Sequence, residues 1–291
     1  MNRKNIDILF KWIFKFAALL SVLILLGIFL MLLLDGVKTF RTISFMEFFM
    51  GDVWNPSGYT EPKFGILSLL MSSIMVTAGA MLIAIPIGVG TAAYLAEFAS
   101  RKVEKYVKPA IEILAGIPSV TIGFLGIVFF GPLIADIFNL SHGLNAFNGS
   151  ILLAIMALPT IISISEDAIY STPNSFKEAS YALGINKWVT LIRVIIPASS
   201  SGIIAAIMLG MGRVIGETMA VLMATGNASA MPENFRSSVQ PLTSTIAIEM
   251  GEVPYNTPHY FALFELGVIL FVITLLINII SERLKTRLKG K

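Results

Sequence analysis

The chain has 291 residues, of which 56% are hydrophobic and only 13% are charged. Soluble domains carry about 25% charged residues, so this composition excludes a soluble globular protein and indicates an integral membrane protein. The absence of cysteine excludes disulfides, thiolate metal sites and cysteine nucleophiles. The net charge of +3 gives no indication of nucleic-acid binding.

Six apolar stretches predict an all-α membrane protein, because each can cross a hydrocarbon core of ~30 Å as a helix if its ends move by a few residues. They are 12–34, 65–96, 113–135, 150–165, 197–225 and 260–281. The first is longer than the apolar region of a signal peptide, so we expect a retained helix. Pro86, Pro118 and Pro159 interrupt the second, third and fourth stretches and predict tilted or bent helices.

The distribution of Lys and Arg predicts the orientation. Sixteen of the 21 cations lie at the two ends of the chain and in its second and fourth connections: Arg3, Lys4, Lys11, Lys15, Arg101, Lys102, Lys105, Lys108, Lys177, Lys187, Arg193, Arg283, Lys285, Arg287, Lys289 and Lys291. Under the positive-inside rule both termini are therefore cytoplasmic. The outer connections then span 35–64, 136–149 and 226–259. The last contains four prolines, so we expect an irregular segment, which either receives an external partner or is a passive connector.

The cytoplasmic segment 171–197 predicts two short helices. Ser171, Thr172 and Pro173 form a helix start, and Gly184 fits the stop of an amphipathic helix. A second helix is expected to begin at Asn186, before Pro197 opens the fifth span. On these residues alone, an ordinary pair of interfacial helices explains the pattern as well as a docking element does.

The same segment resembles the "EAA" loop of ABC importer permeases. Glu178, Ala179 and Ser180 are followed at the family spacing by Gly184 and then by Val194, Ile196 and Pro197, with small changes of residue type at 180, 194 and 196. The resemblance implies a coupling helix, carrying Glu178, Ala179, Ser180 and Gly184, that docks on a separate ATPase subunit. The chain has no Gly-rich phosphate loop ending in Lys-Ser or Lys-Thr, so ATP hydrolysis is expected on another chain.

Arg213 and Glu217 are two opposite charges inside the apolar fifth stretch. Ionisable side chains at membrane depth are costly and usually face a cavity or pathway. Because they are four residues apart, we expect them to share one helix face and to pair. Gly212 and Gly216 would let a neighbouring helix approach this face. A purely structural ion pair that locks two helices together is the alternative.

Residues 210–221, Gly-Met-Gly-Arg-Val-Ile-Gly-Glu-Thr-Met-Ala-Val, resemble the fifth-span signature of PstC-type permeases from phosphate-specific ABC importers. Residues 115–120, Ala-Gly-Ile-Pro-Ser-Val, resemble a second stretch of that family. The resemblance covers nearly the whole chain and implies a MetI-like, type I ABC importer permease. It also implies that Arg213 and Glu217 act in phosphate passage, for which a planar guanidinium fork is well suited.

Several expectations follow from this resemblance. An N-terminal helix with its outer loop, 1–64, would precede a five-helix permease core, 65–291, whose cytoplasmic coupling loop is 171–197. In the bacterial or archaeal cytoplasmic membrane, the partners would be a second, PstA-like permease, two ATPase subunits and an external phosphate-binding protein. No cofactor is expected on this chain, since ATP and Mg²⁺ would bind the ATPase. No metal site is expected either, because His142 and His259 fall in outer connections without an evident partner.

Three alternatives remain from the sequence. The chain could be the paired PstA-type permease, although Met219-Ala220-Val221 argues against it. It could carry another oxyanion, sulfate or molybdate. It could be an ion-coupled secondary carrier that uses Arg213 and Glu217, which the EAA spacing disfavours. Glu166 and Asp167, at the inner end of the fourth span, are interpreted as solvated or docking residues.

Overall fold

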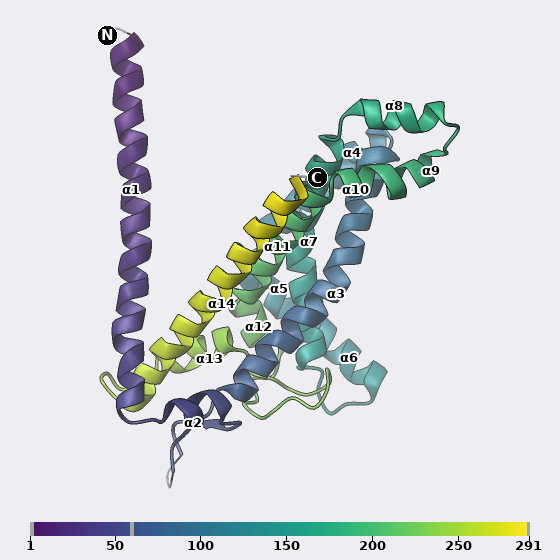
Figure 1. Ribbon diagram of the computed structural model, residues 1–291. Coiled ribbons are helices and arrows are strands. Elements are labelled where there is room, and N and C mark those ends of the chain that lie inside the picture. Colours follow the sequence, from purple (N-terminus) through teal and green to yellow (C-terminus); the bar gives the residue numbers. More distant parts are fainter. Residues whose placement is uncertain (1–2, 59–60, 290–291) are drawn as a thin grey trace.

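The protein is described by a computed structural model that covers residues 3–58 and 61–289. Among the cations used for the orientation, Lys291 and the side chains of Arg3, Lys4, Lys285, Arg287 and Lys289 lie outside what the structure describes. The start of α1 (Arg3–Gly36) and the end of α14 (Pro258–Lys289) lie toward the same end of the molecule as α8 (Asn174–Ala182) (Figure 1). Assignment of that end to the cytoplasm stays a prediction.

Nearly all the regular structure is helical. Between α1 and α14 the elements are η1 (Val37–Arg41), α2 (Phe45–Met50), β1 (Trp54–Asn55), β2 (Lys63–Phe64), α3 (Leu67–Glu97), α4 (Arg101–Gly116), α5 (Ser119–Leu125), η2 (Gly126–Phe130), α6 (Gly131–Phe138), α7 (Ala146–Tyr170), α8, α9 (Lys187–Thr190), η3 (Leu191–Ile195), α10 (Ile196–Ala198), α11 (Ser200–Ile215), α12 (Met219–Ala224) and α13 (Leu242–Glu249). The strands β1 and β2 form a small antiparallel hairpin in which Trp54 pairs with Phe64.

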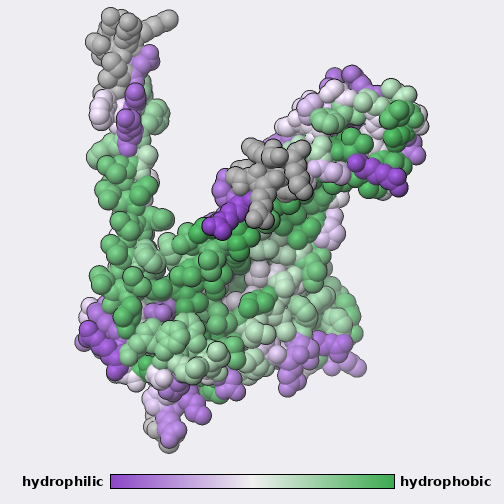
Figure 2. Space-filling view, viewed as in Figure 1, coloured by the Kyte–Doolittle hydropathy of each residue, from purple (hydrophilic) through white to green (hydrophobic). Residues whose placement is uncertain are grey.

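Five helical segments among the described residues are long and apolar enough to cross a membrane: Phe10–Arg41, Leu67–Glu97, Ser119–Phe138, Ala146–Tyr170 and Pro258–Leu284. A sixth span exists only if Lys187–Ala198 and Ser200–Ile215, which meet at a bend of 72°, are taken together. Figure 2 shows the matching surface, a broad apolar belt between two polar ends. The prediction of an all-α membrane protein is confirmed.

The third predicted span begins six residues later than expected, at Ser119 and not at 113. Residues Arg101–Gly116 instead form the separate helix α4, which Ser100 caps by accepting a hydrogen bond from the Val103 N–H. Pro118 stands between the two helices and does not bend a single one. The reason is physical: the residue before a proline is disfavoured in the helical region, so the helix ends there.

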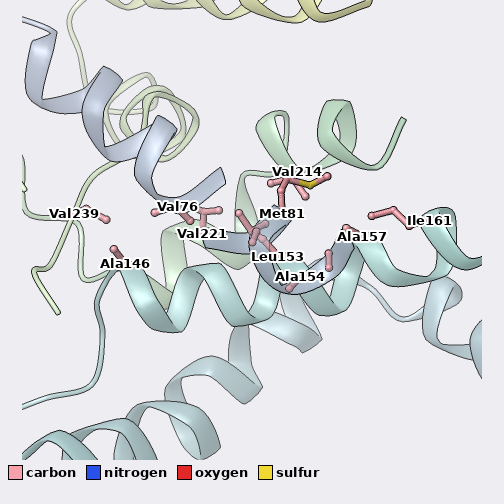
Figure 3. Packing of buried hydrophobic residues seen from close by; sticks show 12 residues of the cluster. Val76, Met81, Ala146, Leu153, Ala154, Ala157, Ile161, Val214, Val221 and Val239 are labelled. Carbon is pink, nitrogen blue, oxygen red and sulfur yellow. The ribbon is translucent and has the colours of Figure 1, made fainter. Parts of the chain in front are cut away.

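The core lies where α3, α7 and α11 pack together. Small residues such as Ala80, Ala84, Ala154 and Ala157 are fully or almost fully buried and allow close approach of the backbones. Figure 3 shows this cluster, in which Val214 and Val221 face the residues of α7. Pro86 and Pro159 lie inside α3 and α7 without ending them. These packed helices form the frame on which the site is built.

The end of the molecule opposite α8 is more ordered than the sequence predicts (Figure 1). The connection 226–259 was expected to be irregular, but it contains α13, whose Leu242, Thr243, Ser244 and Thr245 are buried. Together with the hairpin and the first turns of α14, α13 builds a second core around Phe48 and Trp54. The sequence gives no signal for α13, because the buried residues of this helix are largely Ser and Thr and so show no apolar periodicity.

The helix α1 stands apart from the body and meets α14 only near its C-terminal end (Figure 1). There Phe29 lies against Phe271, with 4.6 Å between ring centroids. Its apolar stretch is otherwise uncovered within this chain.

Candidate functional site

The segment 171–197 folds as the local sequence predicts. α8 spans Asn174–Ala182, and Gly184 follows it with φ +72°, a left-handed conformation that favours glycine. α9 begins after Asn186, whose side-chain oxygen accepts the Val189 N–H at 2.9 Å. Both short helices are thus confirmed, as are the stop at Gly184 and the cap at Asn186. The expected side-chain cap at the start of α8 is wrong, because Pro173 is its N-cap residue and no side chain caps it. Pro197 lies in α10 and does not open the fifth span, since α11 begins at Ser200.

The four predicted coupling residues divide between surface and interior. Glu178, Ala179 and Gly184 are exposed on the outside of this loop. Ser180 is buried, and its hydroxyl lies 2.8 Å from the Thr190 hydroxyl, so it ties α8 to α9. An open groove of about 430 Å³ runs beside them and is lined by Phe176, Ala179, Ser180, Leu183, Ile185, Val194 and Ser175. The exposed residues and this groove are the surface that a partner could contact.

Arg213 and Glu217 do not share a helix, which corrects the prediction of an uninterrupted fifth span. α11 ends at Ile215, and α12 begins at Met219. Glu217 therefore lies in the break, where its side chain accepts the Ala220 N–H at 3.4 Å and caps α12. Among the described residues no ion pair joins Arg213 to Glu217 within 4.0 Å. The i,i+4 relation holds only while the helix continues.

Arg213 lies in the last turn of α11, about 20 Å along the helix axis from its start at Ser200. Its side chain is exposed, and so are the Leu209 side chain and Gly216 on the same side of the helix. No hydrogen bond or ion pair of Arg213 is found within the described part of the chain. The guanidinium thus lies near the end of the bent candidate span, with its five donors open on this side of α11.

Glu217 is held in place by α13. The hydroxyl of Thr243 donates a hydrogen bond to the backbone carbonyl of Glu217 at 2.9 Å, and the Leu242 N–H donates one to the Ser73 hydroxyl of α3 at 2.9 Å. The cavity beside Glu217 measures about 10 Å³, which is room for about one water molecule. That cavity is too small for any larger solute. Neither Thr243 nor Ser73 was predicted, because they meet only through the tertiary fold.

Two other ionisable clusters differ from the predictions. Glu166 is buried and is paired with Lys108 of α4 at 2.9 Å, so it is neither solvated nor free. The hydrogen bonds of Lys108 to Glu104 and Glu166 raise the pKa of its ammonium above the usual range. His259 has a partner after all: its Nε2 lies 2.7 Å from Glu249, a carboxylate that also accepts the Trp54 indole N–H at 2.9 Å.

The geometry is that of a polytopic helical membrane protein with an exposed two-helix loop at one end and two charged residues at a break between helices. The chain belongs to the family described as the binding-protein-dependent transport system inner membrane component, whose model matches residues 84–290. The family places the chain in the inner membrane, as a subunit of a transport system that works with a binding protein.

Three curated relatives cover nearly the whole chain. The probable ABC transporter permease protein YqgH of Bacillus subtilis is 35% identical, over 99% of this chain and 94% of its own length. The phosphate transport system permease protein PstC of Mesorhizobium japonicum is 33% identical, over 98% and 91%. PstC of Pasteurella multocida is 32% identical, over 100% and 95%.

Solved structures share the fold. A chain of a bacterial ABC transporter involved in the import of the acidic polysaccharide alginate superposes with a TM-score of 0.65 at 16% identity, over 98% of this chain and 99% of that one. A chain of the inward-facing MetNI methionine ABC transporter gives 0.59 at 19% identity, over 75% and 93%. The predicted ABC importer permease fold is confirmed.

Proposed function

We propose that this chain is a PstC-type permease subunit of an ATP-driven phosphate importer. Its relatives named as phosphate transport system permease proteins extend over nearly its full length, which supports phosphate as the substrate. The observation that carries the residue-level proposal is Arg213, whose exposed guanidinium lies beside a helix break and has no ion-pair partner among the described residues.

Arg213 fits an oxyanion better than it fits a structural lock. A guanidinium offers parallel N–H donors that match phosphate oxygens in pairs. A structural ion pair needs a carboxylate within reach, and Glu217 turns its carboxylate toward the first turn of α12. The cation therefore keeps its donors for a ligand or for a group on a neighbouring subunit.

Glu217 would act as the gate on the same path. Its carbonyl is tied to Thr243 and its carboxylate to α12, so it is fixed by elements on both sides of the break. Since the adjoining cavity holds about one water, the break itself offers phosphate no passage, and α11 and α12 would have to move relative to each other to open the path on the exposed side of α11. Its negative charge also repels an anion while the break is closed. Alternate access then requires a second conformation of this break.

The partners follow from what the chain leaves open. The side of α11 with Leu209, Gly212, Arg213 and Gly216 would face a second, PstA-like permease, so that the pathway lies between the two. Exposed Glu178, Ala179 and Gly184 would dock one of two ATPase subunits, which bind ATP and Mg²⁺. An external phosphate-binding protein would deliver the substrate on the side of α13. The chain itself would bind no cofactor and hydrolyse no nucleotide.

The test is uptake by the complete complex, reconstituted in vesicles with the binding protein outside. Arg213→Ala should reduce phosphate uptake by about 10- to 100-fold, which is what the loss of a charged hydrogen bond of ~1.5–3 kcal/mol predicts. Arg213→Lys keeps the positive charge but loses the planar pair of N–H donors, so its phosphate uptake should lie between that of the wild type and that of Arg213→Ala. Arg101→Ala removes an exposed cation of α4 and serves as the matched control.

The outcomes separate the parts of this proposal. Normal phosphate uptake by an assembled Arg213→Ala complex would show that Arg213 does not act in passage. If wild-type vesicles take up sulfate or molybdate but not phosphate, the substrate is wrong. Uptake by the purified chain without an ATPase would establish a secondary carrier instead.

A further inference from the structure

The cytoplasmic-side end of α3 is the point to which the loop 171–197 is fastened. Lys177 of α8 lies 2.5 Å from the carboxylate of Glu97, the last residue of α3. The next residue, Phe98, contacts α9: the ammonium of Lys187 lies 4.8 Å from its ring centroid, and the Trp188 ring lies 6.1 Å away. Two consecutive residues of one helix end thus hold both short helices of the loop.

The ion pair at this junction is sheltered from solvent. The side chain of Glu97 is 5% exposed and that of Lys177 is 19% exposed. Within the described residues the Glu97 oxygen that faces Lys177 has no hydrogen-bond partner, so the ammonium is its main compensation. Pulling such a pair apart leaves a charge uncompensated in a poorly solvated place, which costs far more than separating an exposed pair. We therefore expect α8 and the end of α3 to move together.

The loop behaves as one unit because its two helices are joined inside. The buried hydroxyl contact of Ser180 with Thr190 links α8 to α9, and the Ile185 N–H donates to the Ser180 carbonyl at 3.2 Å. A displacement applied to the exposed side of α8 therefore reaches α9 and the end of α3 at the same time.

The other half of α3 reaches the break at Glu217. Ser73 accepts the Leu242 N–H of α13, and both Ser73 and Thr77 line the small cavity together with Glu217. The helix rise places Ser73 about 36 Å from Glu97 along one continuous helix. By contrast, the covalent route from α9 to α11 passes the bend of 72° at Ser199, so a push along α9 and α10 is not directed along α11.

We propose that Glu97 and Phe98 are positioning residues that transmit displacement of the loop 171–197, through α3, to the break at Glu217. The proposal rests on the proposed function in one respect, that an ATPase subunit moves this loop. It adds a route: the mechanical connection runs through the non-covalent junction at the end of α3 and then along α3 to α13 and Glu217.

The experiment uses the complete complex with permease variants that keep the fold. Glu97→Gln should lower the amount of phosphate transported per ATP hydrolysed by at least about fivefold, while the ATPase still co-purifies and still hydrolyses ATP. Phe98→Ala should act in the same direction. The exchanged double variant Glu97→Lys with Lys177→Glu restores an ion pair of opposite sense and should recover most of the ratio. Lys102→Gln, an exposed cation of α4, should leave it unchanged.

A second readout does not depend on the identity of the substrate. Because the chain has no cysteine, a single cysteine at exposed Ile74 in the outer half of α3 can carry an environment-sensitive fluorophore. ATP should change its emission in the wild-type complex and not in the Glu97→Gln complex. If the wild type shows this change but takes up no phosphate, the substrate proposal fails and the route stands.

Three results would overturn the route. One is a wild-type transport ratio in both Glu97→Gln and Phe98→Ala. Another is loss of ATPase co-purification in Glu97→Gln, which would make the residue part of docking. The third is an assembled complex of the double variant Glu97→Lys with Lys177→Glu that does not recover the ratio of phosphate transported to ATP hydrolysed, since an ion pair of either sense should transmit the displacement of the loop.

Discussion

Gly210 and Gly212 allow one substitution to be compared in two environments of the same helix. A Cβ added at Gly210 would lie 2.7 Å from the Cγ1 atom and 3.0 Å from the Cδ1 atom of Ile161, a fully buried residue of α7. A Cβ added at Gly212 would meet no described atom within 4 Å. Gly210→Ala therefore tests the packing of α11 on α7, and Gly212→Ala tests the open side beside Arg213.

The magnitude follows from two terms. Replacing glycine by alanine in a helix interior favours the folded state by up to ~1 kcal/mol at either position. Overpacking a close-packed contact costs about 1–3 kcal/mol, and the β-branched Ile161 has little rotamer freedom with which to yield. Since the helix term is common to both, the difference between the variants isolates the overpacking term. Gly210→Ala should be less stable than Gly212→Ala by about 1–3 kcal/mol.

The assay is denaturant or thermal unfolding of the purified chain in detergent, followed by assembly and uptake in the complete complex. As an isolated chain, Gly212→Ala should be at least as stable as the wild type. In the complete complex it should weaken pairing with the second permease, because small residues let helices approach closely. Equal unfolding of the two variants would refute the α11–α7 packing argument. Normal assembly and uptake by Gly212→Ala would refute the open side as the partner interface.

Two further substitutions, each with a comparison variant, test the hydrogen bonds that Thr243 donates to Glu217 and Trp54 donates to Glu249. Thr243→Val removes the hydroxyl that donates to the Glu217 carbonyl and should cost about 0.5–1.5 kcal/mol in unfolding of the isolated chain, whereas Thr243→Ser should restore most of it. Trp54→Phe keeps an aromatic ring in the outer core but removes the indole donor to Glu249, which should cost about 1.5–3 kcal/mol. Trp12→Phe changes an exposed tryptophan of α1 and should stay within about 0.5 kcal/mol of the wild type; an equal effect of the two Trp variants would contradict the role of the indole bond.

The sequence predicts well what short-range chemistry decides. The start, cap and stop of the two helices in 171–197 depend on Pro173, Gly184 and Asn186, each of which acts within a few residues. The long apolar helices follow from length and hydropathy in the same way. These features need no knowledge of what lies across the fold.

The broken fifth span shows where such reasoning stops. Hydropathy stays apolar from 197 to 225 apart from the two charges, so it gives no sign that the helix ends at Ile215. Gly216 is a weak signal, since glycine is a poor helix former, but many membrane helices tolerate it. What stabilises the break is Thr243, 26 residues further on, whose hydroxyl satisfies a carbonyl that the helix no longer uses.

The polar junctions were missed for the same reason. Trp54 and Glu249 are 195 residues apart, and Lys177 and Glu97 belong to different helices. No spacing rule connects them, because only the tertiary fold brings β1 against α13 and α8 against the end of α3. By contrast, Pro118 could have indicated the end of α4, since the residue before a proline is biased away from the helical region.

The position of Arg213 supports the proposal that a second permease completes the pathway. A guanidinium at membrane depth is tolerated when it pairs, reaches water or lines a polar cavity. Within the described chain Arg213 has no such partner, and Glu217 is occupied in capping α12. The charge can be compensated only by something that approaches the open side of α11, past Gly212 and Gly216. A second permease that lines a watery path, with an anion passing between the two, meets this requirement, whereas lipid alone does not.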